Sequence, residues 1–174
     1  MVLFTKIKEK NGENMAIEIE RKYLVKSNVY KSLAELIPIR QGYISADIYR
    51  IVRVRIAGER AWIGIKSLVT DLERLEFEYE IPLGDAEMIL SKVCPHPIIE
   101  KYRYALDVDG DHWIVDEFLG ENRGLVVAEI ELESPEQNIN LPDWVGEEVS
   151  NDPRYLNANL AVHPYSRWRD RQDS

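Results

Sequence analysis

Charged residues at every second position are the chemically most informative feature of this sequence. Glu18, Glu20 and Lys22 alternate with other residues in a segment expected to be a β-strand. Successive side chains of a strand point to opposite faces, so these three charges share one face. The same alternation recurs at Arg53 and Arg55, at Glu76, Glu78 and Glu80, at Lys101 and Arg103, and at Glu129, Glu131 and Glu133. Guanidinium and ammonium groups bind phosphate oxygens and carboxylates bind divalent cations, so the mixture suits a ligand with several phosphates and metals.

Eight segments alternate between apolar and charged residues and are predicted to be strands. They cover residues 16–26, 40–45, 48–56, 61–68, 75–82, 100–108, 111–118 and 125–133. Gly58 and the Asp109-Gly110 pair indicate tight hairpin turns. Apolar spacing and capping residues predict short helices at residues 29–37, 85–93, 144–149 and 155–162, the first ending at Pro38. The pattern therefore indicates an α+β fold.

The distribution of charge predicts which face of the sheet is buried. An ordinary antiparallel sheet turns its apolar face to a core and its charged face to water. Here most strands carry charges of one sign while the sign changes between strands, whereas solvated faces usually mix signs within a strand. A closed barrel of about eight strands has an inward face that can hold a small ligand. We therefore predict a closed antiparallel β-barrel that forms a charged tunnel and is covered outside by helices.

The charges inside such a tunnel must be hydrated, paired with one another or bound to a ligand, because an unpaired buried ion costs several kcal/mol. A triphosphate with bound divalent cations would compensate both the positive and the negative charges of the tunnel. The groups expected to face it are Arg53, Arg55 and Lys66 for its oxygens, and Glu18, Glu20 and Glu131 for its cations.

Composition limits the class of protein. A chain of 174 residues with 45% hydrophobic content suits one globular domain. The excess of 31 acidic over 22 basic residues argues against a general nucleic-acid surface. The single cysteine, Cys94, cannot form an internal disulfide, which fits a cytoplasmic protein. Residues 1–14 are too charged for a membrane span or signal peptide and are predicted to be a loose extension, with Met15 as an alternative start, and residues 166–174 a frayed tail.

Ordered landmarks along the chain support a family resemblance. They are Glu18, Glu20 and Lys22, then Gln41-Gly42-Tyr43, Arg53-Val54-Arg55, Ile65-Lys66, the segment 74–82, the segment 100–104, Val115-Asp116 and the segment 128–133. Between residues 15 and 165 the chain resembles the CYTH domain, or triphosphate tunnel metalloenzyme, family. The closing stretches 146–149 and 152–155 are similar to those of the compact bacterial members with one CYTH domain. The resemblance implies hydrolysis of inorganic tripolyphosphate.

The resemblance also implies roles for individual residues. The phosphate chain would be bound by Lys22, Arg53, Arg55, Lys66 and Arg103, with Glu76 and Glu78 on the same wall. Mg²⁺ or Mn²⁺ would be held, directly or through water, by Glu18, Glu20, Asp116, Glu129 and Glu131. Lys101 and Tyr43 would position the nucleophile and support the leaving phosphate. Water would attack a terminal phosphorus in line, without a covalent intermediate, and release pyrophosphate and phosphate.

Several alternatives remain open at the level of sequence. The same triphosphate grip could serve a class IV-type adenylate cyclase, a thiamine triphosphatase or a polyphosphate-binding module without turnover. No adenine or thiamine pocket is visible, which favours the inorganic substrate. Tyr43 could be an ordinary half-buried aromatic residue, Lys22 an exposed strand lysine, and Asp116 a partner within its hairpin. An outer apolar patch could support a homodimer.

Overall fold

The computed structural model describes residues 8–10, 13–15, 17–69 and 73–168, and the side chains of residues 19–69 and 75–168. A nine-stranded antiparallel sheet dominates this part of the chain, in the order β10-β9-β8-β4-β5-β6-β7-β3-β11. Its strands are β3 (Ile17–Val25), β4 (Leu36–Ser45), β5 (Ile51–Ala57), β6 (Arg60–Leu68), β7 (Glu73–Ile81), β8 (Ile99–Val108), β9 (Asp111–Phe118), β10 (Val126–Glu131) and β11 (Val145–Glu148). A separate small sheet pairs β1 (Lys8–Lys10) with β2 (Glu13–Met15).

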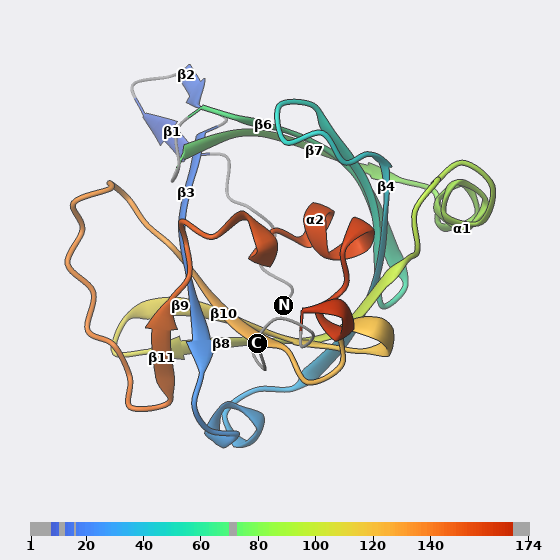
Figure 1. The fold of residues 1–174 in the computed structure, drawn as a ribbon. Helices are drawn as coiled ribbons and strands as arrows, with labels where there is room; N and C mark the ends of the chain where they lie inside the picture. The colour runs from blue at the N-terminus through green and yellow to red at the C-terminus, as the bar shows by residue number, and fades with distance from the viewer. Residues whose placement is uncertain (1–7, 11–12, 16, 70–72, 169–174) are drawn as a thin grey trace.

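Pairing of β10 with β3 closes the sheet into a ring of the eight strands other than β11 (Figure 1). In that pairing Glu129 lies opposite Lys22 and Glu131 opposite Glu20. The β8–β9 hairpin turns at Asp109 and Gly110, with φ angles of 53° and 91° that suit a tight turn of this type. The predicted closed barrel and its hairpin at Asp109-Gly110 are thus confirmed.

The two α-helices lie on opposite sides of the barrel wall (Figure 1). Helix α1 (Leu83–Lys92) packs Ala86 and Leu90 against the outer face of β5 and β6, at Val54 and Ala61. Helix α2 (Asn157–Val162) instead lies inside the ring and packs Leu160 on inward-facing apolar residues. The prediction that 155–162 covers the outer wall is therefore wrong. At that end of the barrel the inward positions are apolar, and burying them stabilises the helix there.

Two further predicted helices are wrong. Residues 29–37 form only a 3₁₀ turn, η1 (Val29–Ser32), followed by β4, which begins at Leu36. Leu33 and Leu36 are 56% and 46% exposed, so the apparent helical stripe faces no core. Pro38 is tolerated because it pairs with β8 alone, outside the stretch of β4 that pairs with β5. Residues 144–149 contain β11, which pairs with β3, because backbone pairing outweighs weak local helix propensity.

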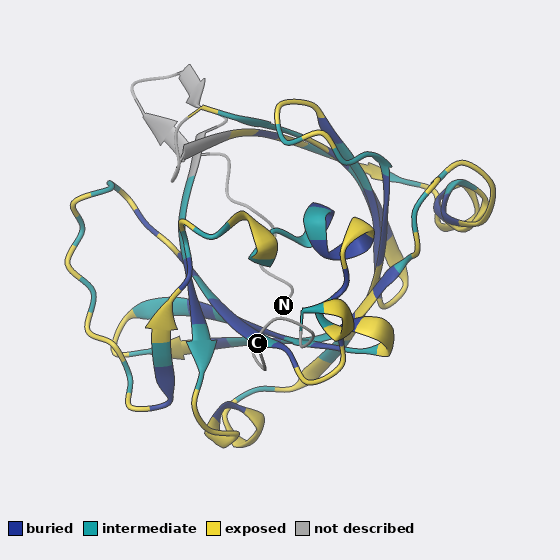
Figure 2. Ribbon diagram, viewed as in Figure 1, coloured by how far each residue is buried: buried dark blue, intermediate teal, exposed yellow. Residues whose placement is uncertain are grey.

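The outer face of the barrel is covered unevenly. One side carries an aromatic cluster in which Trp113 of β9 and Tyr30 of η1 are fully buried and pack with Trp144. On β6 and β7, by contrast, Ile65, Phe77 and Tyr79 are at least 44% exposed. Figure 2 shows buried residues gathered along the strands of the ring and exposed residues on the outer turns of α1. The predicted homodimer stays a prediction.

The remaining short helices are η2 (Gly120–Asn122), η3 (Pro153–Tyr155) and η4 (Tyr165–Arg167). Of these, η3 and η4 flank α2 and complete the C-terminal segment at that end of the barrel. None of the helices in the described ranges has the length and apolar run that a bilayer crossing requires. The predicted loose extension at residues 1–14 and frayed tail at 166–174 lie largely outside the described residues.

Candidate active site

The alternating charges meet on the inner face of the ring, where opposite charges pair between strands. We call this set the charged inner wall. Its members with described side chains are Glu20, Lys22, Arg53, Arg55, Lys66, Glu76, Glu78, Lys101, Arg103, Asp116 and Glu129. Five of these predicted site residues, Lys22, Arg55, Glu76, Lys101 and Asp116, are buried, and the side chains of the other six are at most 15% exposed, so the set is enclosed in ion pairs rather than spread over the surface.

The first part of the wall comes from β5, β6 and β7. Arg53 Nη2 lies 3.0 Å from Glu78 Oε1, and Arg55 Nη2 lies 2.8 Å from Glu78 Oε2. These pairs cross β6 at Gly64, which lies opposite both Arg53 and Glu78 and offers no side chain to block them. Lys66 on β6 contacts Glu76 at 2.8 Å. Burial, together with neighbouring Arg53, lowers the pKa of Arg55 to about 10.

The second part of the wall centres on Lys22 of β3. Its ammonium lies 2.6 Å from Glu129 Oε1 and 2.9 Å from Glu20 Oε1. Burial opposes the charge, but the two carboxylates outweigh it and raise the pKa of Lys22. Burial likewise opposes the charge of Glu129, and the nearby cations, with Lys22 first, hold its pKa below the usual range. Lys22 is 5% exposed and is not an ordinary surface lysine.

The third part of the wall joins β8 to β9. Asp116 Oδ2 accepts from Lys101 Nζ at 2.5 Å and from Arg103 Nη2 at 2.8 Å, and Asp116 Oδ1 accepts from Arg103 Nε at 2.8 Å. Lys101 and Asp116 are 1% and 0% exposed. Burial lowers the pKa of Lys101 to about 8, although Asp116 acts to raise it. Asp116 therefore serves as the counter-charge of two buried cations.

Tyr43 is buried and lies at the apolar end of the inner face. Its hydroxyl accepts a hydrogen bond from Gln41 Nε2 at 2.8 Å, and burial raises its pKa to about 12. Gln41 Nε2 also donates to Asn157 Oδ1 at 3.2 Å, and Lys101 Nζ donates to the same oxygen at 3.0 Å. Sequence reasoning assigned no role to Gln41 or Asn157. Gln41 could have been found from the sequence, because it lies two residues before Tyr43 and so shares its strand face. No local sequence pattern marks Asn157.

Three glutamates of the alternating pattern, Glu18, Glu80 and Glu131, are not among the members of the charged inner wall named above. The side chain of Glu18 lies outside the described residues, although its backbone belongs to β3. Glu131 lies at the end of β10, is exposed and takes part in an interaction. Glu80 lies toward the end of β7 and pairs with exposed Arg60, in keeping with its prediction as a solvated carboxylate.

The carboxylates of the charged inner wall can be compared with the ligands that a divalent cation requires. Within the described residues no group of three or more His, Cys, Asp or Glu side chains is preassembled for a metal ion. The register nevertheless places Glu20 opposite Glu131, with Glu129 two residues away on the same strand. Carboxylate oxygens are the ligands that Mg²⁺ and Mn²⁺ prefer. The ammonium of Lys22 already lies between Glu20 and Glu129, so a positive charge is accommodated there.

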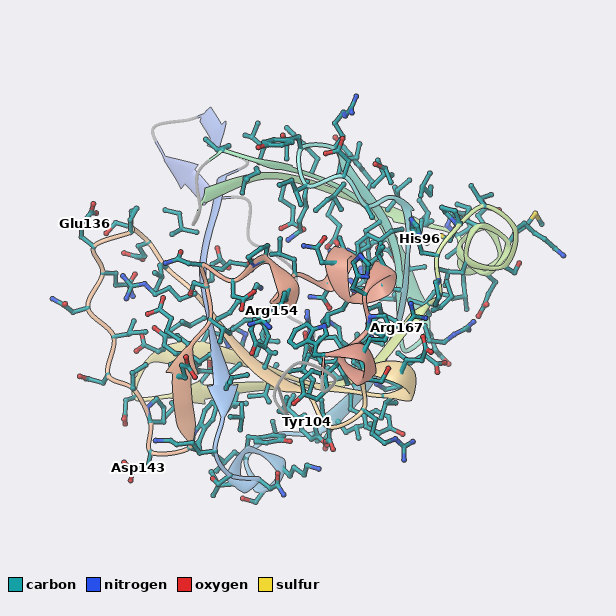
Figure 3. All side chains as sticks on the ribbon, viewed as in Figure 1. His96, Tyr104, Glu136, Asp143, Arg154 and Arg167 are labelled. Atoms are coloured by element: carbon teal, nitrogen blue, oxygen red, sulfur yellow. The ribbon has the colours of Figure 1, made fainter. Side chains whose placement is uncertain are left out.

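A separate pocket of about 1320 Å³ lies beside the C-terminal segment. Its lining includes Leu24, Glu148, Arg154 and Arg167, and the members of the charged inner wall do not line it. Figure 3 shows Arg154 and Arg167 on the segment around α2. This pocket is therefore distinct from the charged inner wall.

Comparisons with known proteins agree with the fold. A model of the CYTH domain matches residues 16–165. An inorganic triphosphatase of Acetivibrio thermocellus is 49% identical over 156 residues, covering 90% of this chain and 100% of that protein. An inorganic triphosphatase of Nitrosomonas europaea is 36% identical over 149 residues, covering 83% and 97%. A crystal structure of an inorganic triphosphatase has a TM-score of 0.63 at 32% identity and covers 83% of this chain and 94% of that one. The chain belongs to the CYTH domain family, as its sequence landmarks predicted.

Proposed function

We propose that this protein is a metal-dependent enzyme that hydrolyses inorganic tripolyphosphate to pyrophosphate and phosphate. The observation that carries the proposal is the charged inner wall, where six basic side chains, each at most 15% exposed, converge inside a closed ring and are each held by a carboxylate. A polyanion can take over the charge compensation that the carboxylates supply. Similarity to two inorganic triphosphatases supports the same substrate. The single cysteine supports a cytoplasmic location.

Each part of the wall has a proposed task in substrate binding. Arg53 and Arg55 present planar guanidinium groups that can each bind two phosphate oxygens. Lys66, Lys22 and Arg103 add charge along the same face. Glu76 and Glu78 hold Arg53, Arg55 and Lys66 in place before substrate binds, so little reorganisation of these three is needed on binding.

The carboxylates Glu20, Glu129 and Glu131 are proposed to hold Mg²⁺ or Mn²⁺, together with Glu18. A bound divalent ion would supply charge compensation for the phosphate oxygens and lower the pKa of a coordinated water. Asp116 was also predicted to bind metal. Its oxygens are instead engaged by Lys101 and Arg103, so we assign it to positioning those cations.

Lys101 and Tyr43 are proposed to act on the reacting groups. The ammonium of Lys101 has three N–H groups, of which Asp116 and Asn157 accept two among the described residues. The third can donate to the attacking water or to a phosphate oxygen. Water then attacks a terminal phosphorus in line, and pyrophosphate leaves with its charge compensated by the arginines. The protonated Tyr43 hydroxyl can donate to the leaving group.

The direct test is phosphate release from tripolyphosphate, ATP and thiamine triphosphate in parallel, with Mg²⁺, Mn²⁺ or a chelator, while cyclic AMP is measured separately. We expect metal-dependent hydrolysis of tripolyphosphate and no cyclic AMP. Cyclic AMP would identify a cyclase, preference for the thiamine compound a thiamine triphosphatase, and tight tripolyphosphate binding without turnover a binding module.

The catalytic assignment is tested with Lys101→Ala. The variant should lower kcat more than it raises KM, because Lys101 is proposed to act on the reacting groups more than on the phosphate grip. Lys92→Ala, at the exposed end of α1, is the control and should match the wild type. An unchanged kcat in Lys101→Ala would remove this lysine from the mechanism.

A further inference from the structure

A chain of buried and partly buried hydrogen bonds links the two proposed catalytic groups. Tyr43 Oη accepts from Gln41 Nε2, whose other hydrogen bond goes to Asn157 Oδ1. The same oxygen of Asn157 accepts from Lys101 Nζ at 3.0 Å. Asn157 thus joins Tyr43 of β4, through Gln41, to Lys101 of β8. It comes from a segment 56 residues beyond Lys101 in the chain.

The location of Asn157 explains why it can act as this link. It is the first residue of α2, whose apolar residues Ala158 and Leu160 are buried against the inward side chains of the barrel, including Phe118. That packing holds the start of the helix against the inner wall. The ring of Phe118 also lies 5.3 Å from Lys101 Nζ. Helix α2 therefore closes one end of the barrel and brings an amide oxygen to Lys101.

We propose that Asn157 is a positioning residue that fixes the ammonium of Lys101 and, through Gln41, the hydroxyl of Tyr43 for attack on the triphosphate. This inference rests on the proposed function and adds a role for the helix inside the barrel. Asn157 is a positioning residue because its contacts are with Lys101 and Gln41 and its effect reaches the reaction through them.

The physical reason lies in the freedom of a lysine side chain. Four rotatable bonds let the Lys101 ammonium move unless several acceptors hold it, and Asp116 alone fixes one N–H. Gln41 depends on Asn157 as well, since Gln41 Oε1 is buried without a hydrogen-bond partner in the described part of the chain. Displacement of a catalytic group by about 1 Å can cost about a hundredfold in rate. Loss of the Asn157 acceptor should therefore reduce turnover.

The first experiment compares Asn157→Ala with Asn159→Ala in tripolyphosphate hydrolysis. Asn159 is a matched control because it lies in the same helix and its side chain bonds the backbone oxygen of Pro153 instead of the inner wall. We expect kcat of Asn157→Ala to fall about 10- to 100-fold with KM changed less than about threefold. Asn157→Asp, which keeps an acceptor oxygen, should recover most of kcat. Equal kcat in the two alanine variants, or no recovery with Asp, would overturn the proposal.

A double-mutant cycle with Lys101→Ala tests whether Asn157 acts through Lys101. Asn157→Ala should lower kcat by a smaller factor in the Lys101→Ala background than in the wild type, because one of the two groups it positions is already absent. A full additional loss would overturn the proposal.

The inference can also be judged if the wild-type protein proves not to hydrolyse tripolyphosphate. Crystal structures of the wild type and of Asn157→Ala would then be compared. Displacement of Lys101 Nζ and of the Gln41 amide in the variant would support the positioning role even though the proposed function had failed. Unchanged positions of both groups would overturn it.

Discussion

Replacing Asp116 by Asn tests whether this carboxylate is the counter-charge of Lys101 and Arg103. Arg103 would keep Glu129 at 3.9 Å but lose its closer ionic partner at two hydrogen bonds, worth about 1.5 to 3 kcal/mol for a charged group. Lys101 can limit its own loss by releasing a proton. With a pKa of about 8, neutralising it at pH 7 costs about 1 kcal/mol. The two contributions together predict a loss of about 3 to 4 kcal/mol, within the range of about 3 to 5 kcal/mol for breaking a buried ion pair.

The assay is urea unfolding at pH 7 in a chelator, followed by tryptophan fluorescence. In thermal unfolding the same loss should lower Tm by roughly 10 °C for a chain of this size. Asp107→Asn in the same hairpin is the control, because Asp107 has a side chain that is 80% exposed, and should change the free energy of unfolding by less than about 0.5 kcal/mol. A loss below about 1 kcal/mol in Asp116→Asn would refute the assignment of Asp116 as the counter-charge.

Three further expectations concern metal binding, pH and packing. Glu131→Gln should raise the Mg²⁺ concentration needed for half-maximal hydrolysis. Glu133→Gln, at an exposed position, is the control. A wild-type Mg²⁺ dependence in Glu131→Gln would remove Glu131 from the proposed metal ligands. The folded-state pKa of Lys101 is about 8 against 10.5 in the unfolded chain, so the unfolded state binds more protons between these values and stability rises with pH there. The free energy of unfolding of the wild type should therefore increase relative to Lys101→Met from pH 7.5 to pH 10, and a constant difference would contradict the lowered pKa. Gly42→Ala should destabilise the fold by about 1 to 3 kcal/mol, because its Cβ would lie 2.8 Å from side-chain atoms under α1, whereas Gly84→Ala, with open space around it, should be tolerated in urea unfolding.

The sequence was sufficient to predict the closed barrel and most of the charged inner wall. Alternation at Arg53 and Arg55 depends only on the geometry of a strand, which holds wherever that strand lies. The change of sign between strands then indicated that these faces meet one another. In the structure these faces do meet, and opposite charges pair between them, as Lys22 does with Glu129.

Local pattern was misleading where pairing with a distant strand decided the structure. Residues 29–37 show helical spacing, yet β4 begins at Leu36 because its backbone pairs with β8. Residues 144–149 become a strand because β3 leaves an edge on which β11 can pair. In both segments the partner lies far away in the sequence, so no window of neighbouring residues contains the deciding interaction.

The sequence by itself determined which residues share a strand face, which signs those faces carry and which family the chain belongs to. Tertiary structure decided that α2 enters the barrel and that Asn157 reaches Lys101 and Gln41. The physical reason is that a strand face follows from the repeat of adjacent residues, whereas the position of α2 follows from apolar burial inside a ring that exists only after β10 has paired with β3.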